Sequence, residues 1–297
     1  MNRRNLAKLL AAVVAVGLVV AAFIGGQGRQ SGLRIHPNRG NPGRYYARLQ
    51  TMGTRAHLEV VADSREEARK MLAPAADAVR QVDRLMSTYI SNSDISRLNR
   101  NGAEKPVEVH PRVMTVLEKA KELCRLSGGA FDVTSGPLRD LWLDAQEDDR
   151  VPSESALQET LDRVGCDKLT LEGETARLAA DGVRVDLGGI AKGYAIDRAA
   201  EAIREHGGEG ALVDIGGDMR LLGRRADGGR WRIRVRTPPR IELDDPVYLK
   251  VEDRAVATSG DYARFYRVDG ERYSHIVDPR TGEPVKNVPS STVIART

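Results

Sequence analysis

The chain has 297 residues, and 41% of them are hydrophobic, an ordinary proportion for a globular protein with a substantial core. Its 46 basic and 42 acidic side chains are interleaved, leave a net charge of only +4, and accompany an aromatic content of 4%. Neither the charge nor the aromatic content is typical of nucleic-acid binding, so we expect no nucleic-acid partner.

The first residues have the layout of an export segment. Basic residues among the first eight precede an almost unbroken apolar run at 9–24, and a polar stretch follows it. The run is shorter than the ~20 residues of a comfortable membrane span, so a cleaved signal peptide and a membrane anchor both stay open for 1–28. We expect a polar spacer at 29–43 and an exported domain at 44–297, on the periplasmic side of the inner membrane and either anchored or secreted.

The first half of the domain predicts two strands followed by helices. Strands are expected at 44–52 and 56–62 from their alternating pattern. Ser64 and Glu67 form an S-x-x-E capping box ahead of a helix with apolar residues at helical spacing up to Met86. A second helix starts at Pro111 and stops at a Gly-Gly pair, and a third follows Ser153.

Short alternating runs dominate the second half and are interrupted by one helix, expected at 191–206. Strands are expected at 168–171, 183–187, 211–215, 231–235, 247–251, 255–258, 273–277 and 291–295. This order predicts an α+β fold, a mostly antiparallel sheet with helices packed on it.

The cysteines and histidines give weaker signals. Cys124 follows Val113, Leu117 and Ala120 on the apolar side of a helical repeat, which favours a buried, unpaired thiol. A disulfide with Cys166 is the alternative in an oxidising compartment. The five histidines are scattered without ligand spacing, which argues against zinc.

The stretch VDLGGIAKGYAID, residues 185–197, carries the strongest chemical signal. Asp186 and two glycines lead into a predicted helix whose first turn contains Lys192. Backbone N–H groups at a helix start attract anions, and a lysine adds charge there. The alternative is a tight strand-to-helix turn with Asp186 as its cap.

Other stretches with chemical side chains occur along the chain. GGAFDVTSGPL contains Asp132 and Thr134, LVDIGGDMRLLG contains two aspartates, and YSHIVDPRTGEPV contains His275. Together with TMGT, DRLMSTYISNSDISRLN and ATSGDY, these stretches resemble, in one order from residue 44 to the end, the ApbE family of flavin transferases.

The resemblance implies an ApbE-like fold and an enzyme that moves FMN from FAD onto a threonine or serine hydroxyl of an exported redox protein, releasing AMP. It implies that FAD is the substrate and Mg²⁺ the cofactor, with the Gly189 carbonyl facing the metal. Of the matching residues, His275 is the candidate base, Lys192 the cation that neutralises phosphate charge, and Asp186 a hydrogen-bond acceptor. The residues expected to line the FAD site are Met52, Tyr89, Ala130, Phe131, Asp132, Asp186, Lys192, His275 and Ile276.

One part of the family pattern is absent. No Asp-Ala-x-x-Thr segment, which holds magnesium in the family, follows Thr281. We therefore expect a C-terminally incomplete domain, weak magnesium binding, and an unpaired sheet edge at 291–295. Two other activities stay open, an FAD pyrophosphatase that yields FMN and AMP, and a flavin-binding relative without catalysis.

Overall fold

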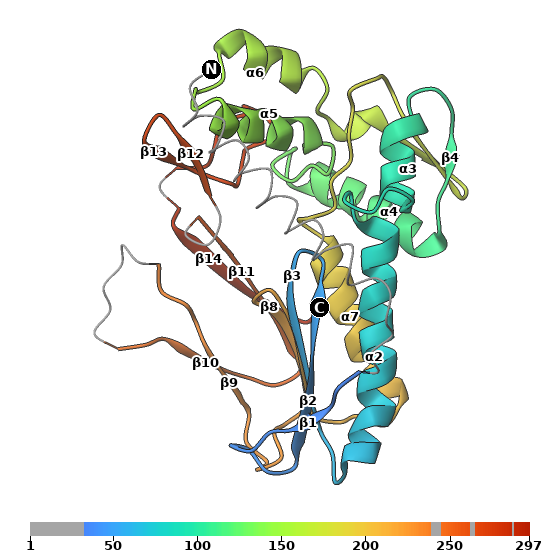
Figure 1. The fold of residues 1–297 in the computed structure, drawn as a ribbon, viewed down its shortest axis with the longest axis vertical. Helices are drawn as coiled ribbons and strands as arrows, with labels where there is room; N and C mark the ends of the chain where they lie inside the picture. Colours follow the sequence, from blue (N-terminus) through green and yellow to red (C-terminus); the bar gives the residue numbers. More distant parts are fainter. Residues whose placement is uncertain (1–32, 239–244, 262–264, 287) are drawn as a thin grey trace, which may run out of the picture. The chain divides into compact units, whose positions relative to one another are not determined.

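The computed structural model describes residues 33–238, 245–261, 265–286 and 288–297 (Figure 1). The chain divides into two units, Met1–Arg34 and Ile35–Thr297, and the fold below is that of the second. The predicted leader at 1–28 lies outside the described residues. Among the residues that are described, no helix is both long enough and apolar enough to cross a membrane.

A seven-stranded sheet runs through the unit in the order β1-β2-β3-β7-β8-β11-β14, and every neighbouring pair is antiparallel. Its first strand, β1, falls within the stretch expected to be a spacer. β14 is the last strand in the described order and pairs with β11. The strands are β1 (His36–Pro37), β2 (Arg44–Thr51), β3 (Thr54–Val61), β7 (Ala211–Ile215), β8 (Asp218–Leu222), β11 (Arg254–Gly260) and β14 (Ser290–Ala295).

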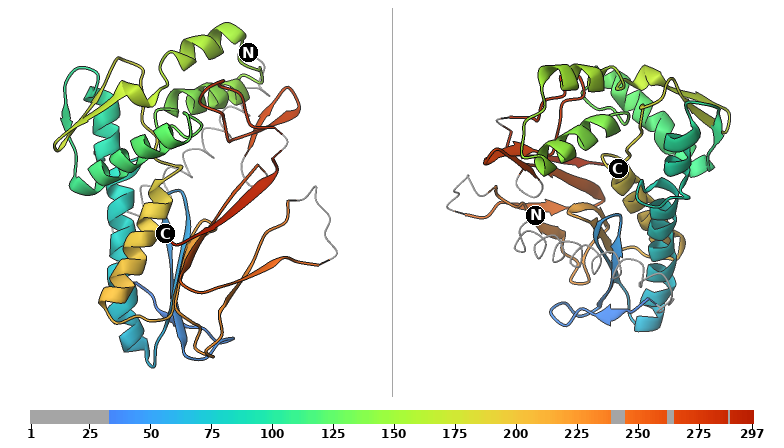
Figure 2. Two further views of the ribbon diagram at one scale, coloured as in Figure 1. Left: turned by 180° about the vertical axis from the view of Figure 1, so that it is seen from behind. Right: turned by 45° about the horizontal axis from the view of Figure 1, so that its top comes forward.

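Two long helices, α2 (Arg65–Met86) and α7 (Ala191–Glu205), lie side by side on one face of this sheet (Figures 1 and 2). The expected capping box starts α2, because Ser64 accepts from the Glu67 N–H and Glu67 accepts from the Asp63 N–H. The inward stripe of α7 is rich in alanine, which lets it approach α2 and the strands closely. Helical spacing of apolar residues therefore predicted both helices correctly.

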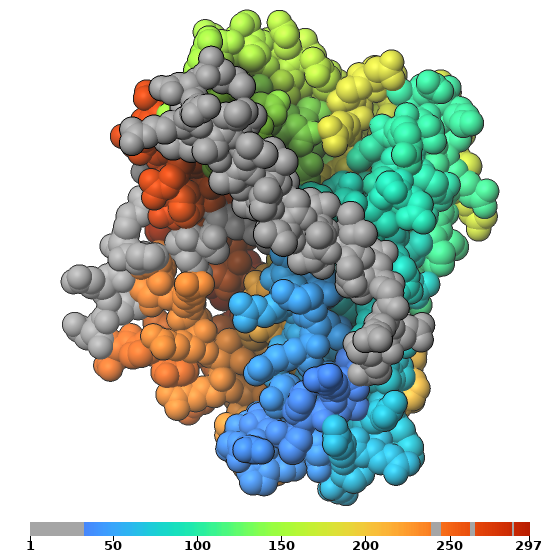
Figure 3. All heavy atoms as spheres, viewed as in Figure 1, coloured from blue at the N-terminus to red at the C-terminus, as the bar shows by residue number. Residues whose placement is uncertain are grey.

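The opposite face of the sheet carries the antiparallel pair β9 (Trp231–Arg234) and β10 (Tyr248–Val251). Trp231, Val251, Leu221 and Val256 form an apolar cluster there. The space-filling view shows the orange β9–β10 region beside the blue strands β1–β3 (Figure 3), where the Arg44 guanidinium lies 5.6 Å from the centre of the Trp231 ring.

Shorter elements gather at one end of the long helices (Figure 1). Trp142 connects its helix to two segments near the C-terminus. It packs with Tyr266, and its indole N–H donates to the Gly282 carbonyl over 2.9 Å. The elements are α3 (Asp94–Asn101), β4 (Val107–Glu108), α4 (Pro111–Leu126), α5 (Gly136–Glu147), α6 (Glu154–Leu161), the 3-10 turn Cys166–Lys168, β5 (Leu169–Glu172), β6 (Thr175–Leu178), β12 (Phe265–Val268) and β13 (Glu271–Ser274).

Two sequence predictions are wrong. Residues 183–187 form no strand, and only a single parallel bridge joins Arg184 to Ser135. Cys124 is buried as expected, but it forms a disulfide with Cys166. Helical periodicity showed which way Cys124 points, and it carried no information about the turn that brings Cys166 to it.

Candidate functional site

The segment at 183–193 is the centre of the candidate site, and contacts from distant parts of the chain shape it. The Asp186 N–H donates to the Val133 carbonyl over 2.7 Å, which joins the segment to the loop between α4 and α5. The Asp186 carboxylate accepts from the Gly188 N–H over 2.7 Å. This short side-chain bond turns the chain directly before the start of α7.

Gly189 lies against the ring of Phe131. A Cβ atom at Gly189 would be 3.1 Å from Phe131 Cε2, closer than side chains normally pack. The structure therefore brings together Phe131, Asp186 and Gly189, three of the residues predicted from the resemblance. Ala130, beside Phe131, is exposed.

Lys192 in the first turn of α7 forms an ion pair with Asp218 at the start of β8. Asp218 also accepts from the Thr258 N–H over 3.3 Å, so the lysine reaches across to the sheet. Nearby, burial raises the pKa of Asp214 above its ordinary value, an effect strengthened by Asp218 and opposed by the Gly217 N–H bond and by Lys192. Two carboxylates and one ammonium group thus share the space beside the α7 start.

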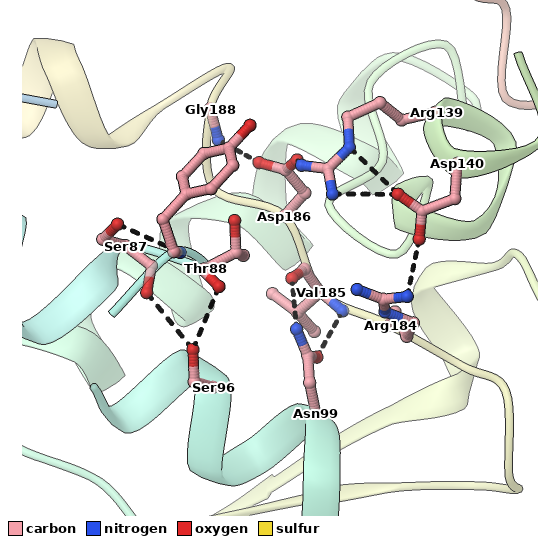
Figure 4. Close-up of polar contacts among 11 residues, drawn as sticks. Ser87, Thr88, Ser96, Asn99, Arg139, Asp140, Arg184, Val185, Asp186 and Gly188 are labelled. Atoms are coloured by element: carbon pink, nitrogen blue, oxygen red, sulfur yellow. Dashed lines mark hydrogen bonds and ion pairs between the residues drawn. The ribbon is translucent and has the colours of Figure 1, made fainter. Parts of the chain in front are cut away.

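Arg139 on α5 is a residue that the sequence analysis missed. Its guanidinium pairs with Asp186 and with Asp140, and Arg184 pairs with Asp140 in turn (Figure 4). Burial would lower the pKa of Arg139, but the Asp186 and Asp140 carboxylates outweigh burial and raise it. The Tyr89 phenol also raises the pKa of Arg139, so Tyr89 is within electrostatic range of this arginine. The Tyr89 side chain is 83% exposed. No periodicity in the sequence could have indicated this pairing.

Met52 lies at the tip of the β2–β3 hairpin. It has a left-handed backbone with φ 50°, and its N–H donates to Asp83 over 3.0 Å. The Gly216 N–H donates to the Arg55 carbonyl over 3.0 Å, so the β2–β3 and β7–β8 hairpins are adjacent. Met52 is therefore at the same end of the sheet as the Lys192–Asp218 pair.

His275 and Ile276 follow β13 in the segment that leads to the turn at Asp278. The Ile276 carbonyl accepts from the Val285 N–H over 2.8 Å. The side chain of Arg280 lies 3.6 Å from the position of a Cβ on Gly129, which places this turn beside the α4–α5 loop. The loop is the one that carries Phe131.

Asp132 makes its polar contacts with Thr134 and Cys124. Its carboxylate is buried and accepts from both the N–H (2.8 Å) and the hydroxyl (2.7 Å) of Thr134, next to the disulfide. Burial raises its pKa, partly offset by Thr134. In this structure Asp132 holds the loop together, and its predicted contact with FAD stays a prediction.

The predicted magnesium site at Gly189 has few ligands in the described part of the chain. The grouping found there of three His, Cys, Asp or Glu ligand atoms within 4.8 Å is Cys124, Asp132 and Cys166, and the two sulfurs are bonded to each other. Beside Gly189, the described residues form no second group of three such ligand atoms. The described residues by themselves therefore do not provide the set of oxygen ligands that a magnesium site needs.

A separate surface hollow of about 590 Å³ lies over β1–β3. It is lined by residues including His36, Tyr46, Arg48, His57 and Glu59. None of the predicted site residues lines this hollow, so its size does not make it the candidate active site.

Comparisons with known proteins agree with the architecture. The model of the ApbE family matches residues 52–297. A FAD:protein FMN transferase of Vibrio cholerae is 38% identical over 82% of this chain and 74% of its own length, and one of Haemophilus influenzae is 33% identical over 84% and 75%. The crystal structure of the ApbE protein of Thermotoga maritima has a TM-score of 0.76 at 34% identity, covering 85% of this chain and 82% of that one. The flavin transferase ApbE of Vibrio cholerae has a TM-score of 0.74 at 35% identity, covering 86% and 82%.

Proposed function

Because this chain belongs to the ApbE family, we propose that it transfers FMN from FAD to a threonine or serine hydroxyl of another protein. The observation that carries the proposal is the convergence of Phe131, Asp186 and Gly189 at the start of α7, beside the Lys192–Asp218 pair. The FAD:protein FMN transferases of Vibrio cholerae and Haemophilus influenzae support it further.

In the proposed reaction the acceptor oxygen attacks the phosphorus of the FMN half of FAD. The bond from this phosphorus to the bridging oxygen breaks, AMP leaves, and a phosphoester joins FMN to the acceptor. Negative charge develops on the transferring phosphoryl group and on AMP. We assign the stabilisation of this charge to Lys192, which lies in the first turn of α7, and to backbone N–H groups at that helix start.

The acceptor hydroxyl must lose its proton as the new bond forms. We propose that His275 accepts this proton, because an unperturbed imidazole has a pKa of about 6.5, close to neutral pH. Its segment lies beside the Phe131 loop through the Arg280–Gly129 contact. Asp186 would accept hydrogen bonds from FAD once Arg139 shares or releases its carboxylate.

Magnesium dependence is a proposal from the resemblance alone. When bound, the ion would neutralise phosphate oxygens. No step above depends on it, since Gly189 has no carboxylate cluster beside it among the described residues.

We further propose an exported location and an exported redox protein as acceptor. The support is the basic N-terminus followed by the apolar run at 9–24. Fractionation of cells that express the full chain tests this, and recovery in the cytoplasm alone would contradict it.

Incubation of the chain with FAD, Mg²⁺ and a threonine-bearing acceptor domain tests the reaction. Flavin fluorescence on the acceptor's gel band, together with released AMP, is the expected result. Free FMN without labelled acceptor would indicate hydrolysis instead, and unchanged FAD would contradict any catalytic role. A parallel reaction with a chelator measures the contribution of magnesium.

A further inference from the structure

Helix α3 bonds to two segments of the candidate site, the loop that carries Tyr89 and the segment that carries Asp186. Near its start it holds the loop that precedes it in the chain and carries Tyr89. Ser93 donates to the Ser87 carbonyl over 2.6 Å, and Ser96 donates to the Ser87 and Thr88 carbonyls over 3.4 and 3.3 Å. The backbone of Ser87 and Thr88, directly before Tyr89, is therefore tied to α3 (Figure 4).

About one turn further along the helix, α3 holds the segment of Asp186. Asn99 Nδ2 donates to the Val185 carbonyl over 2.9 Å, and Asn99 Oδ1 accepts from the Val185 N–H over 2.7 Å (Figure 4). Val185 is 1% exposed and belongs to no strand. A buried backbone without a strand ladder needs other partners, and one asparagine supplies both of them here.

Ser96 and Asn99 are three residues apart, so they project from the same side of the helix. Ser96 bonds to the carbonyls of the two residues that precede Tyr89. Asn99 bonds to Val185, the residue that precedes Asp186. Helix α3 thus connects two segments that carry residues predicted to touch FAD, Tyr89 and Asp186, which are far apart in the sequence.

We propose that Asn99 is a positioning residue, which fixes Asp186 relative to Tyr89 so that both can contact the same FAD molecule. The inference rests on the proposed function. Asn99 itself touches neither the substrate nor the reacting atoms. Without it, the Val185 N–H and carbonyl would seek new partners, and Asp186 would shift from the productive geometry.

Two variants test this. Asn99→Asp keeps the shape and the acceptor but replaces the donor to the Val185 carbonyl with a repelling oxygen, and Asn99→Ala removes both bonds. We expect each to raise the KM for FAD about 10-fold or more, with kcat reduced less than about 3-fold, because FAD binding loses a preorganised contact.

The matched control is Ile95→Val, a buried residue of the same helix that makes neither bond. It should weaken α3 packing and lower Tm with an unchanged KM. A KM raised equally by Ile95→Val, or left at the wild-type value by both Asn99 variants, would overturn the proposal.

Hydrogen exchange in the ligand-free chain separates this inference from the proposed function. Asn99→Ala should speed exchange at Val185, Asp186 and Gly188 beyond the change that Ile95→Val causes. This result supports the positioning role of Asn99 even if the wild-type chain turns over no FAD. Unchanged exchange at these amides refutes the positioning role of Asn99 even if the chain is an active transferase.

Discussion

Two stretches of the chain have almost the same sequence and fold differently. VDLGG at 185–189 and VDIGG at 213–217 differ at one position, leucine for isoleucine. The second is the end of β7 and a two-residue turn into β8. The first is in no strand and leads into α7.

The difference lies in what surrounds each stretch. Val213 pairs with strands on both sides, with Leu58 on β3 and with Arg220 on β8. Val185 has the side chain of Asn99 in place of a strand, and Asp186 has the Val133 carbonyl of a loop. The VDIGG stretch is held by neighbouring strands, whereas the VDLGG stretch depends on side chains and loops that must themselves be fixed.

The glycines also have different purposes. Gly216 and Gly217 have φ of 68° and 98°, which disfavour residues with a Cβ. Gly188 and Gly189 are not in that left-handed region. At Gly189 a larger residue is disfavoured because the Phe131 ring approaches the position of its Cβ. Identical letters therefore meet a dihedral requirement in one place and a packing requirement in the other.

The largest predicted effect comes from the disulfide that stabilises the surroundings of the VDLGG stretch. Cys124 and Cys166 are 42 residues apart, and closing such a loop stabilises a protein by about 2–4 kcal/mol. The double variant Cys124→Ala/Cys166→Ala should lose this amount in denaturant unfolding. Hydrogen exchange should increase at Asp186, which donates to the disulfide-linked loop, and stay unchanged at Gly217.

Reductant provides the control for this prediction. It should destabilise the wild-type chain to the same extent and leave the double variant unaffected. An unfolding midpoint of the wild-type chain that does not respond to reductant would contradict a stabilising role.

The next effect concerns Lys192, which joins the two stretches through Asp218. Lys192→Ala should lower flavin transfer about 100-fold, because one preorganised group that stabilises transition-state charge is lost. Stability should fall by less than about 1 kcal/mol, since the ion pair is partly exposed. Covalent flavin on the acceptor is the measurement, with Lys119→Ala on the exposed side of α4 as the control. Transfer within two-fold of the wild type would remove Lys192 from the proposed mechanism.

The glycines allow the comparison to be tested directly. Gly217→Ala has free space around the new Cβ but a φ of 98°, so it should cost about 1–2 kcal/mol of stability through the backbone. Gly189→Ala requires no left-handed backbone but displaces the Phe131 ring, so it should cost about 1 kcal/mol and weaken FAD binding. Thermal unfolding and FAD titration of both variants measure the two effects. Equal effects of the two variants on FAD affinity would show that the glycines do not differ as described.

The sequence predicted the parts of the fold that follow from local pattern. The capping box and apolar stripe of α2, and the alternation in β2, β3 and β7, gave those elements with shifts of only a few residues. It failed at 183–187, where alternation of apolar residues came from burial against a helix and loops, without strand pairing.

The sequence indicated the candidate site only through the order of its motifs. Local pattern located Asp186, Gly189 and Lys192 at a helix start, but the contacts of Asp186 with Arg139 and of Cys124 with Cys166 are set by tertiary packing. Spacing in the sequence is not related to distance in space for such pairs. The partner of a buried or half-buried charge therefore had to come from the structure.

The smallest predicted effect concerns the pH dependence of the VDIGG stretch. The pKa of Asp214 is raised by burial above its ordinary 3.8, so the folded chain holds this proton more tightly than the unfolded chain. The resulting stabilisation is complete below pH 3.8 and is lost as the pH rises through the folded pKa.

Asp214→Asn removes this titration while its amide oxygen can still accept from the Gly217 N–H. The variant should therefore gain stability relative to the wild type as the pH rises from acid to neutral, by less than about 1 kcal/mol after solvent screening. Urea unfolding at several pH values measures the difference, with the exposed Asp77→Asn as the control. A variant that instead loses stability toward neutral pH would mean that the Asp214 carboxylate is stabilised by Lys192 and His57 more than burial disfavours it, and the β7–β8 turn would then depend on α7 as the VDLGG stretch depends on α3.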